Sequence, residues 1–268
     1  MKEIKLEEQR SIQVEVLKDV HKFCTEHKIT YFLAYGTLLG AIRHKGYIPW
    51  DDDIDIIMPR SDYERFFKTY GNETYEALDY KKDKTYPYPF GKISDKRTIL
   101  KEEKIRFDLE NGIYIDVFPL DGITENIKKA QMLFKRMQIL KTIMTLKLKR
   151  IRGLKRSLCR QVLFVTLQGI VCFIPYKWVL KKIDYLAQTA SNNPHNNYAG
   201  VLVENDNHLS IYPKITSYKD LILVDFEQYQ FYAPKEYDKI LKSNYGNYME
   251  LPPEEERVPH HLCKMWWK

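Results

Sequence analysis

The stretch YGTLLGAIRHKGYIPWDDDIDIIMP, residues 35–59, places four aspartates within five residues, directly after a tryptophan. Carboxylates packed this closely repel one another, so they need a positive charge to face. The end of the stretch alternates acidic and aliphatic residues, which predicts a strand with one buried face. Asp51, Asp53 and Asp55 share one parity and are expected on the other face. Asp52 is expected on the opposite side, either solvated or supporting the other three from behind.

A further carboxylate, Asp116, stands alone among apolar residues in a second predicted strand, GIYIDVFPL at 112–120. Carboxylates that converge from neighbouring strands hold Mg²⁺ or Mn²⁺ for phosphoryl chemistry, and an all-oxygen ligand set disfavours zinc. We therefore predict a catalytic metal site with Asp53, Asp55 and Asp116 as ligands. Asp51 is the fourth predicted catalytic residue, either as a ligand, by orienting a bound water, or as the group that takes the acceptor's proton.

Two other interpretations compete for the acidic run. An EF-hand calcium loop needs glycine at its sixth position and glutamate at its twelfth, where this sequence has Ile56 and Asp62. A solvated acidic strand is the commoner outcome for a run of charges. It leaves unexplained why Ile54 and Ile56 anchor one face of the strand while the other face is uniformly acidic.

Several residues near the aspartates are suited to bind phosphate. Gly36 and Thr37 lie at a predicted turn from strand to helix, where glycine lets a phosphate approach the backbone and the helix amino end binds it. Arg43 and Lys45, in the loop before the acidic run, and Lys92 in FGKISD are predicted to contact phosphates through their charge. Ordinary surface charge is the alternative for these cations.

The surrounding sequence predicts the elements that must position these residues. Apolar residues at three- and four-residue spacings over 5–28 predict a helix with one buried face. A buried strand is predicted over 29–36, followed by a short helix. Ser61 and Glu64 form an S-x-x-E capping box, which predicts a helix over 62–70.

Residues 124–190 differ from the rest, because they lack strand patterning and carry basic and aliphatic residues at helical spacing. We predict two or three helices in this basic segment. It separates a catalytic core, residues 1–123, from a C-terminal segment, 191–268, that completes the catalytic domain. That last segment predicts strand, turn, strand and a helix from about Pro234.

Charge is distributed unevenly along the chain. Residues 126–183 contain fifteen Lys or Arg and no Asp or Glu, so the remainder carries a net charge of −8. The apolar run at 163–174 is shorter than the ~20 residues of a membrane crossing. It suits a buried helix or one that lies among lipid headgroups, with basic flanks on an anionic membrane surface. Nucleic acid is not expected as a partner, because aliphatic residues rather than interleaved aromatics fill the region.

Two features bear on the compartment. The four cysteines are far apart and form no C-x-x-C pair, which argues against a disulfide framework or a zinc ribbon. The first ten residues are polar, with no apolar run behind them, so no secretory signal is predicted. We expect a cytoplasmic protein, peripheral on the inner face of the membrane where the basic segment docks.

Three stretches carry a resemblance to a known family. YGTLLGAIRHKGYIPWDDDIDIIMPRSDYERF at 35–66, GIYIDVFPLDG at 112–122 and YGNYMELPPEEERVPHH at 245–261 resemble the LicD family of phosphocholine transferases, to which fukutin is also similar. The resemblance implies an α+β fold, with a nucleotidyltransferase-like mixed sheet flanked by helices and a mainly helical basic insertion.

The same resemblance implies an activity. It is the metal-dependent transfer of phosphocholine, or a related phospho-alcohol, from a CDP-activated donor such as CDP-choline. The implied acceptor is a sugar hydroxyl of a cell-surface glycan, lipopolysaccharide or teichoic-acid precursor, either free or lipid-linked, and CMP is released. Trp50 is the first candidate for an aromatic box around the choline cation. His260 and His261 are weaker candidates for acid–base or ligand roles.

Two other functions stay open at this point. A nucleotidyltransferase moves a nucleoside monophosphate from an NTP to a small molecule, protein or RNA, and releases pyrophosphate. A non-catalytic membrane-docking module needs no intact site, and the retention of Gly36, Asp53, Asp55 and Asp116 argues against it.

Overall fold

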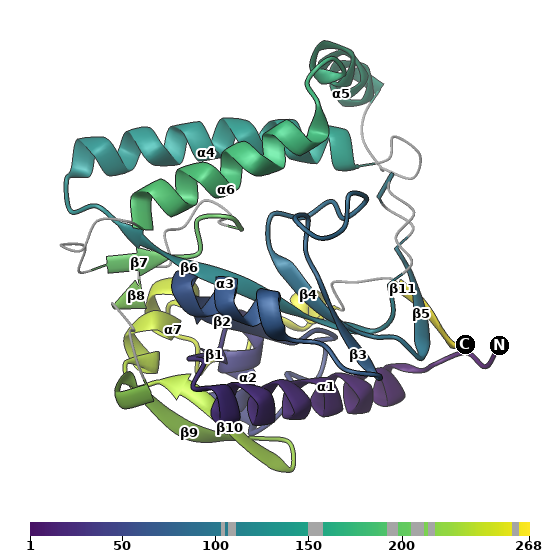
Figure 1. The fold of residues 1–268 in the computed structure, drawn as a ribbon, viewed down its shortest axis with the longest axis vertical. Coiled ribbons are helices and arrows are strands. Elements are labelled where there is room, and N and C mark those ends of the chain that lie inside the picture. The colour runs from purple at the N-terminus through teal and green to yellow at the C-terminus, as the bar shows by residue number, and fades with distance from the viewer. Residues whose placement is uncertain are drawn as a thin grey trace.

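The computed structural model describes residues 1–102, 105–106, 111–149, 158–191, 198–204, 212–213, 218–258 and 263–268. It confirms the α+β class, because a mixed sheet is flanked by helices (Figure 1). The main sheet runs in the order β1 (Phe32–Leu33), β2 (Asp55–Pro59), β6 (Tyr114–Ile123), β4 (Gly91–Asp95) and β3 (Tyr75–Leu78). The strands β7 (Tyr198–Gly200) and β8 (Tyr212–Pro213) extend it from the far end of β6.

Helices surround this sheet, and α1, α3 and α6 all contact its central strand β6. In Figure 1, α4 and α6 lie together above the sheet and α1 runs below it. The helices of the described part are α1 (Leu6–His27), α2 (Tyr35–His44), α3 (Arg60–Thr69), α4 (Ile127–Leu148), α5 (Leu158–Val171), α6 (Tyr176–Ser191) and α7 (Tyr237–Tyr245).

Two small antiparallel sheets and two short 3₁₀ turns complete the fold. One sheet pairs β9 (Leu221–Phe226) with β10 (Tyr229–Pro234), and the other pairs β5 (Thr98–Glu102) with β11 (Cys263–Trp267). The 3₁₀ turns are η1 (Tyr218–Asp220) and η2 (Glu254–Glu256). The pairing of β5 with β11 brings the C-terminus beside the first residues of the chain (Figure 1).

The apolar periodicity of α1 is used as predicted. Val16, Val20 and Cys24 are fully buried in the main core, together with Ile56 of β2. The helix ends where Lys28 adopts a left-handed backbone, and its amide bonds the carbonyls of the last turn. This core packs α1 against β6 and β4, and β2 pairs with β6, so the acidic end of β2 has a fixed position.

Two local predictions near the site are wrong. The strand predicted over 29–36 is only two residues long, because Ala34 caps a helix that already begins at Tyr35. The capping box at Ser61 does not form. Helix α3 begins two residues earlier than predicted, at Arg60, with Pro59 as its cap and no hydrogen bond from a capping side chain. Glu64 forms an ion pair with Arg60 instead of closing a capping box.

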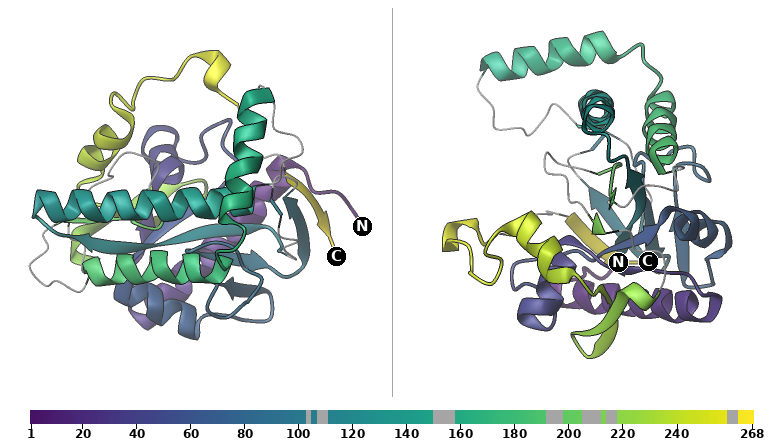
Figure 2. Two further views of the ribbon diagram at one scale, coloured as in Figure 1. Left: turned by 90° about the horizontal axis from the view of Figure 1, so that it is seen from above. Right: turned by 90° about the vertical axis from the view of Figure 1, so that its left-hand side faces the viewer.

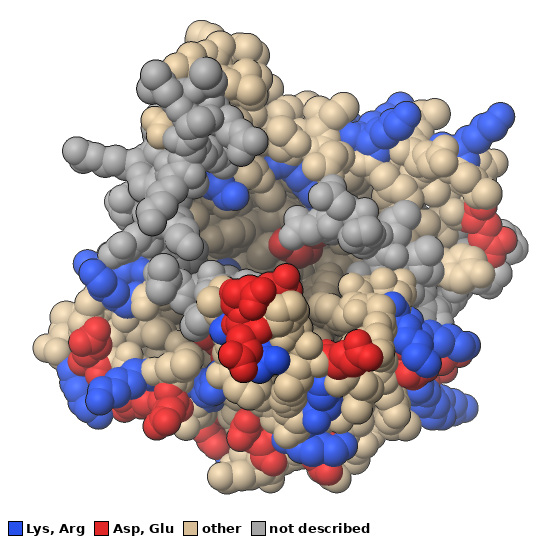
Figure 3. Space-filling model, turned by 180° about the vertical axis from the view of Figure 1, so that it is seen from behind, with Lys and Arg blue, Asp and Glu red and all other residues tan. Residues whose placement is uncertain are grey.

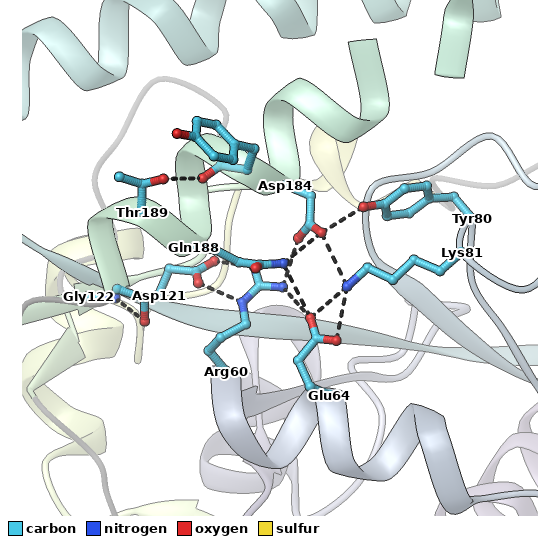
Figure 4. Close-up of polar contacts among 11 residues, drawn as sticks. Arg60, Glu64, Tyr80, Lys81, Asp121, Gly122, Asp184, Gln188 and Thr189 are labelled. Atoms are coloured by element: carbon cyan, nitrogen blue, oxygen red, sulfur yellow. Dashed lines mark hydrogen bonds and ion pairs between the residues drawn. The ribbon is translucent and has the colours of Figure 1, made fainter. Parts of the chain in front are cut away.

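Arg60 joins three elements in a buried ionic network (Figure 4). From the first turn of α3 it binds Asp121 of β6 through two nitrogens, at 2.7 and 2.6 Å. A third nitrogen binds Asp184 of α6 at 2.8 Å. The hydroxyl of Tyr80 and the amide of Gln188 also donate to Asp184. The network therefore fastens the basic helical segment to the sheet.

Within the described residues, no single helix is long and apolar enough to cross a membrane. Residues Gln161–Val171 of α5 and the whole of α6 reach that length and composition only when they are taken together, and they bend by 85° at the break between them.

Candidate active site

The two acid-bearing strands are neighbours. Strands β2 and β6 run parallel, and Asp55 lies opposite Asp116 in their register. Partner residues in such a pair point to the same face of the sheet. The amide of Asp116 donates to the carbonyl of Ile54 at 2.8 Å, which extends the pairing to the last residue before β2. Two carboxylates from segments sixty residues apart in the chain thus lie side by side, as the sequence pattern suggested.

At the turn from β1 into α2, the backbone of Gly36 lies against the side chain of Asp51 in the acidic run. A Cβ on Gly36 would lie 2.5 Å from Oδ2 of Asp51, so only glycine allows this carboxylate its position. Thr37 is buried, and its hydroxyl accepts a hydrogen bond from the amide of Asp55 at 2.9 Å. The Gly-Thr pair therefore positions both ends of the acidic run.

The carboxylates lie close enough to change one another's acidity. Burial raises the pKa of Asp55, and the negative charges of Asp53 and Asp116 add to this. Burial and the neighbouring Asp53 likewise raise the pKa of Asp51. The carboxylate oxygens of Asp51, Asp52 and Asp53 come within 4.8 Å of one another. Such a cluster favours a bound cation, which lowers the cost of keeping all the carboxylates ionised.

Of the two alternatives for Asp52, the structure excludes solvation and agrees with a supporting position. Its side chain is buried, because the strand starts only at Asp55 and the alternation of faces does not extend back through residues 51–53. Two glutamines of α1, Gln9 and Gln13, donate to its carbonyl at 2.7 and 3.2 Å. This makes Asp52 part of the support for the acidic run.

Helix α1 holds the acidic run with polar side chains that the sequence did not single out. Besides the two glutamines, Arg10 donates from Nε to the carbonyl of Asp51 at 3.0 Å and from a terminal nitrogen to Pro49 at 2.8 Å. The side-chain hydroxyl of Tyr47 donates to Gln13 at 2.9 Å. Polar residues on a helix usually indicate solvent-exposed positions. Only their contacts with distant residues show that they support the acidic run.

Lys92 is bound to one of the acids. Its ammonium lies 2.7 Å from Oδ1 of Asp116, and the residue is only 3% exposed. Aromatic rings surround it, with centroids at 3.4 Å for Tyr114, 4.9 Å for Tyr88 and 5.7 Å for Phe90. Lys92 therefore offsets the charge of Asp116 and lies outside the cavity lining described next.

A cavity of about 700 Å³ opens on the acidic run. Its lining combines predicted residues with a C-terminal contribution from α7 and the stretch up to η2: Gly36, Leu39, Arg43, Ile48, Trp50, Asp51, Asp53, Asp55, Tyr245, Asn247, Tyr248, Glu250, Leu251, Pro252, Pro253 and Glu256. Five of these residues are acids and Arg43 is the one cation. Figure 3 shows the molecule hollowed at the centre of one face, with acidic side chains inside and below the hollow.

The structure places the other predicted residues as follows. Arg43 reaches the C-terminal segment, where it donates to the carbonyls of Tyr248 at 2.7 Å and Glu250 at 3.0 Å. Its Nε is buried with no hydrogen-bond partner among the described residues. Lys45 is exposed at the end of α2, outside the cavity lining.

Trp50 lies at the cavity wall beside a cation. The guanidinium carbon of Arg257 lies 5.6 Å from the centre of its ring, so this face already attracts positive charge. Glu250 and Glu256 contribute negative charge to the same cavity. His260 and His261 lie outside the described residues.

One known protein is similar to this chain over almost its whole length, and other matches cover parts of it. Residues 28–156 match the family model described as LicD/FKTN/FKRP, nucleotidyltransferase domain. Over 274 residues the chain is 32% identical to the lipopolysaccharide cholinephosphotransferase LicD of Haemophilus influenzae, and the match covers 98% of each protein. An uncharacterized protein of Rickettsia typhi is 39% identical over 67 residues, 25% of this chain and 22% of that protein. The end-to-end match to the Haemophilus influenzae protein shows that the chain belongs to the LicD family.

Proposed function

We propose that this protein is an enzyme that transfers phosphocholine from CDP-choline to a sugar hydroxyl of a cell-surface glycan such as lipopolysaccharide, with release of CMP. The observation that carries the proposal is the cavity of about 700 Å³ that Asp51, Asp53, Asp55 and Trp50 line together, which is large enough for a nucleotide. The cholinephosphotransferase activity in the name of the Haemophilus influenzae relative supports the same reaction.

The charge of the cavity supports a divalent metal. A diphosphate donor is anionic, and five acids with one guanidinium would repel it unless cations enter as well. Carboxylate oxygens are ligands for Mg²⁺ or Mn²⁺, and we assign them to Asp51, Asp53 and Asp55, with Asp116 beside them. When bound, the metal supplies charge stabilisation for the diphosphate as CMP leaves.

The protein's own groups orient the donor around this centre. Gly36 leaves the backbone open where α2 begins, beside Asp51. Arg43 is the cation of the cavity wall, and its guanidinium is held by two carbonyls of the C-terminal segment. The donor's quaternary ammonium suits the face of Trp50, with Glu250 and Glu256 nearby. The cavity thus offers opposite ends of the donor different chemistry.

Replacing Trp50 by Leu tests the assignment of the choline end. We expect the KM for CDP-choline to rise about 3- to 30-fold with a smaller change in kcat, because a cation–π contact contributes about 0.5–2 kcal/mol. Steady-state kinetics of CMP release measure it. Trp178→Leu, an exposed tryptophan of α6, is the matched control and should leave KM unchanged. An equal loss in both variants would remove Trp50 from the binding site.

The function itself is tested by CMP release from a panel of CDP-alcohols with Mg²⁺ and a lipid-linked glycan acceptor. The panel comprises CDP-choline, CDP-ethanolamine, CDP-glycerol and CDP-ribitol, with Asp53→Asn as the inactive comparison. We expect CMP from CDP-choline alone, lost in the variant. Turnover of another CDP-alcohol would support the same mechanism but show that a different phospho-alcohol is transferred. Pyrophosphate release from an NTP, with no CMP from the panel, would replace the proposal by nucleotidyl transfer.

A further inference from the structure

Helix α5 stands apart from the body of the molecule in Figure 1, and in both views of Figure 2 it extends well beyond α4 and α6. One side of it packs on the end of α4, where Phe164 and Val171 are buried against Leu146. Gln168 adds a hydrogen bond from its amide to the carbonyl of Leu146 at 2.6 Å. The helix is thus fixed in place, and no other element of the described part of the chain covers its remaining sides.

The uncovered sides are apolar. Exposed side chains extend from the helix into the turn that follows it, where Phe173 is 89% exposed and Ile170 is 66% exposed; the others are Val162, Leu163 and Val165. Residues 161–176 contain no charged side chain, and Arg160 and Lys177 flank them in the sequence. We name residues 161–173 the apolar tip. Exposed apolar residues gathered in this way mark a binding surface.

The stretch of sequence that contains the apolar tip has charge of one sign. Residues 126–183 carry fifteen Lys or Arg and no acid. An isologous dimer through the tip would bring two such segments together, and their like charges would repel. A surface with negative charge above an apolar layer complements both features, and a lipid bilayer with anionic headgroups has that composition.

We propose that the apolar tip inserts among the headgroups of an anionic membrane and holds the protein on its surface. Helix α5 has 14 residues, about 21 Å at 1.5 Å per residue, which is too short for a hydrocarbon core of roughly 30 Å. Helix α6 cannot extend it, because Val179, Leu180 and Ile183 are buried in the core of the protein. The tip therefore lies in the interface and does not span it.

The position of the tip gives such docking a consequence. In the right-hand view of Figure 2, α5 projects to the same side as the C-terminal segment after α7, drawn in yellow, which lines the cavity. A membrane at the tip is then on the side of the molecule that carries this cavity wall. An acceptor held in the lipid surface is brought near the site without further binding energy from the protein.

Co-sedimentation of the full chain with vesicles tests the proposal without any assay of transfer. The vesicles contain phosphatidylcholine with about 30 mol% phosphatidylglycerol, or phosphatidylcholine alone. We expect wild type to bind the anionic vesicles and to bind less as salt rises. The double variant Leu163→Ser with Phe173→Ser should lower the partition coefficient about 10-fold or more, because two large apolar groups are lost.

A matched variant controls for the general loss of exposed apolar surface. Leu223→Ser with Ile127→Ser changes two apolar residues outside the tip, which are 50% and 72% exposed, and should bind as wild type does. Circular dichroism checks that both double variants are folded. Failure of wild type to bind anionic vesicles, or an equal loss in the control, would overturn the proposal. So would a dimer, measured by light scattering, that only the tip variant abolishes.

Discussion

Replacing Asp55 by Asn should lower the rate of CMP release by about 10²- to 10³-fold, with little change in the KM for the donor. This carboxylate shares the face of the sheet with Asp116 and is close enough to Asp53 for their charges to interact, so it connects the acidic run to the acid of β6. An amide keeps the shape of the side chain but would hold a divalent cation less strongly, so the diphosphate would lose part of the charge stabilisation that the cation supplies in the transition state, and losing one such stabilising group typically costs that factor. Initial rates at saturating Mg²⁺ and donor measure the effect.

The control for this variant is Asp225→Asn, an exposed aspartate of β9 that bonds only Gln230 among the contacts described. It should retain wild-type kinetics. Rates of Asp55→Asn within a factor of about three of wild type would show that the acidic run is not the catalytic centre.

The same variant should gain stability as it loses activity. Asp53 and Asp116 both raise the pKa of Asp55, so in the absence of metal its charge costs free energy in the folded protein. Removing that charge should increase the free energy of unfolding in EDTA by about 0.5–2 kcal/mol, the usual range for a single stabilising substitution. Urea denaturation of both proteins in EDTA measures the difference, and a destabilised variant would mean that Asp55 serves the fold.

How far the sequence predicts this site depends on the range of the contacts involved. Period-two alternation located β2 and β6, and it correctly placed Asp55 and Asp116 on a common face, because strand geometry fixes side-chain direction locally. The same rule failed at Asp52, since the three residues before Asp55 are not in a strand. Alternation in the sequence predicts the face of a side chain only where the residues form a strand.

Contacts between distant segments left no local pattern. Arg43 binds Tyr248, 205 residues away, and this contact brings the C-terminal segment into the cavity wall. The similarity of that segment to the LicD family was visible in the sequence, but its place beside the acids was not. Lys92 likewise reads as a free cation, whereas the pairing of β4 with β6 aligns it with Asp116. Such partners are decided by sheet order, which the sequence alone does not state.

Arg60 connects this catalytic sheet to the helical segment that carries the apolar tip. Along the parallel pair, Asp55 and Asp116 mark the first register position, while Arg60 and Asp121 follow the last one. The ion pair thus closes the opposite end of the same two strands. Through Asp184 the same guanidinium holds α6, so loosening it affects both the acidic run and the position of α5.

Replacing Arg60 by Met should destabilise the protein by about 3–5 kcal/mol, because two buried carboxylates lose their shared cation. Arg60 is 11% exposed at its side chain, and Asp121 is fully buried. Burial by itself raises the pKa of Asp184, but Arg60 and Tyr80 more than offset it, so the net pKa is lowered and the carboxylate is held ionised. Without the guanidinium that ionisation becomes a cost. Urea denaturation at pH 7 measures the loss of stability.

Arg65→Met, on the same helix, is the matched control. Arg65 is 49% exposed and pairs with Asp62 near the surface, so its loss should cost less than about 1 kcal/mol. Adding Asp121→Asn to Arg60→Met should recover at least about 1 kcal/mol, because the variant then buries one uncompensated charge fewer. Equal effects at the two arginines, or no recovery in the double variant, would show that packing of the side chain, and not its charge, holds the two strands and α6 together.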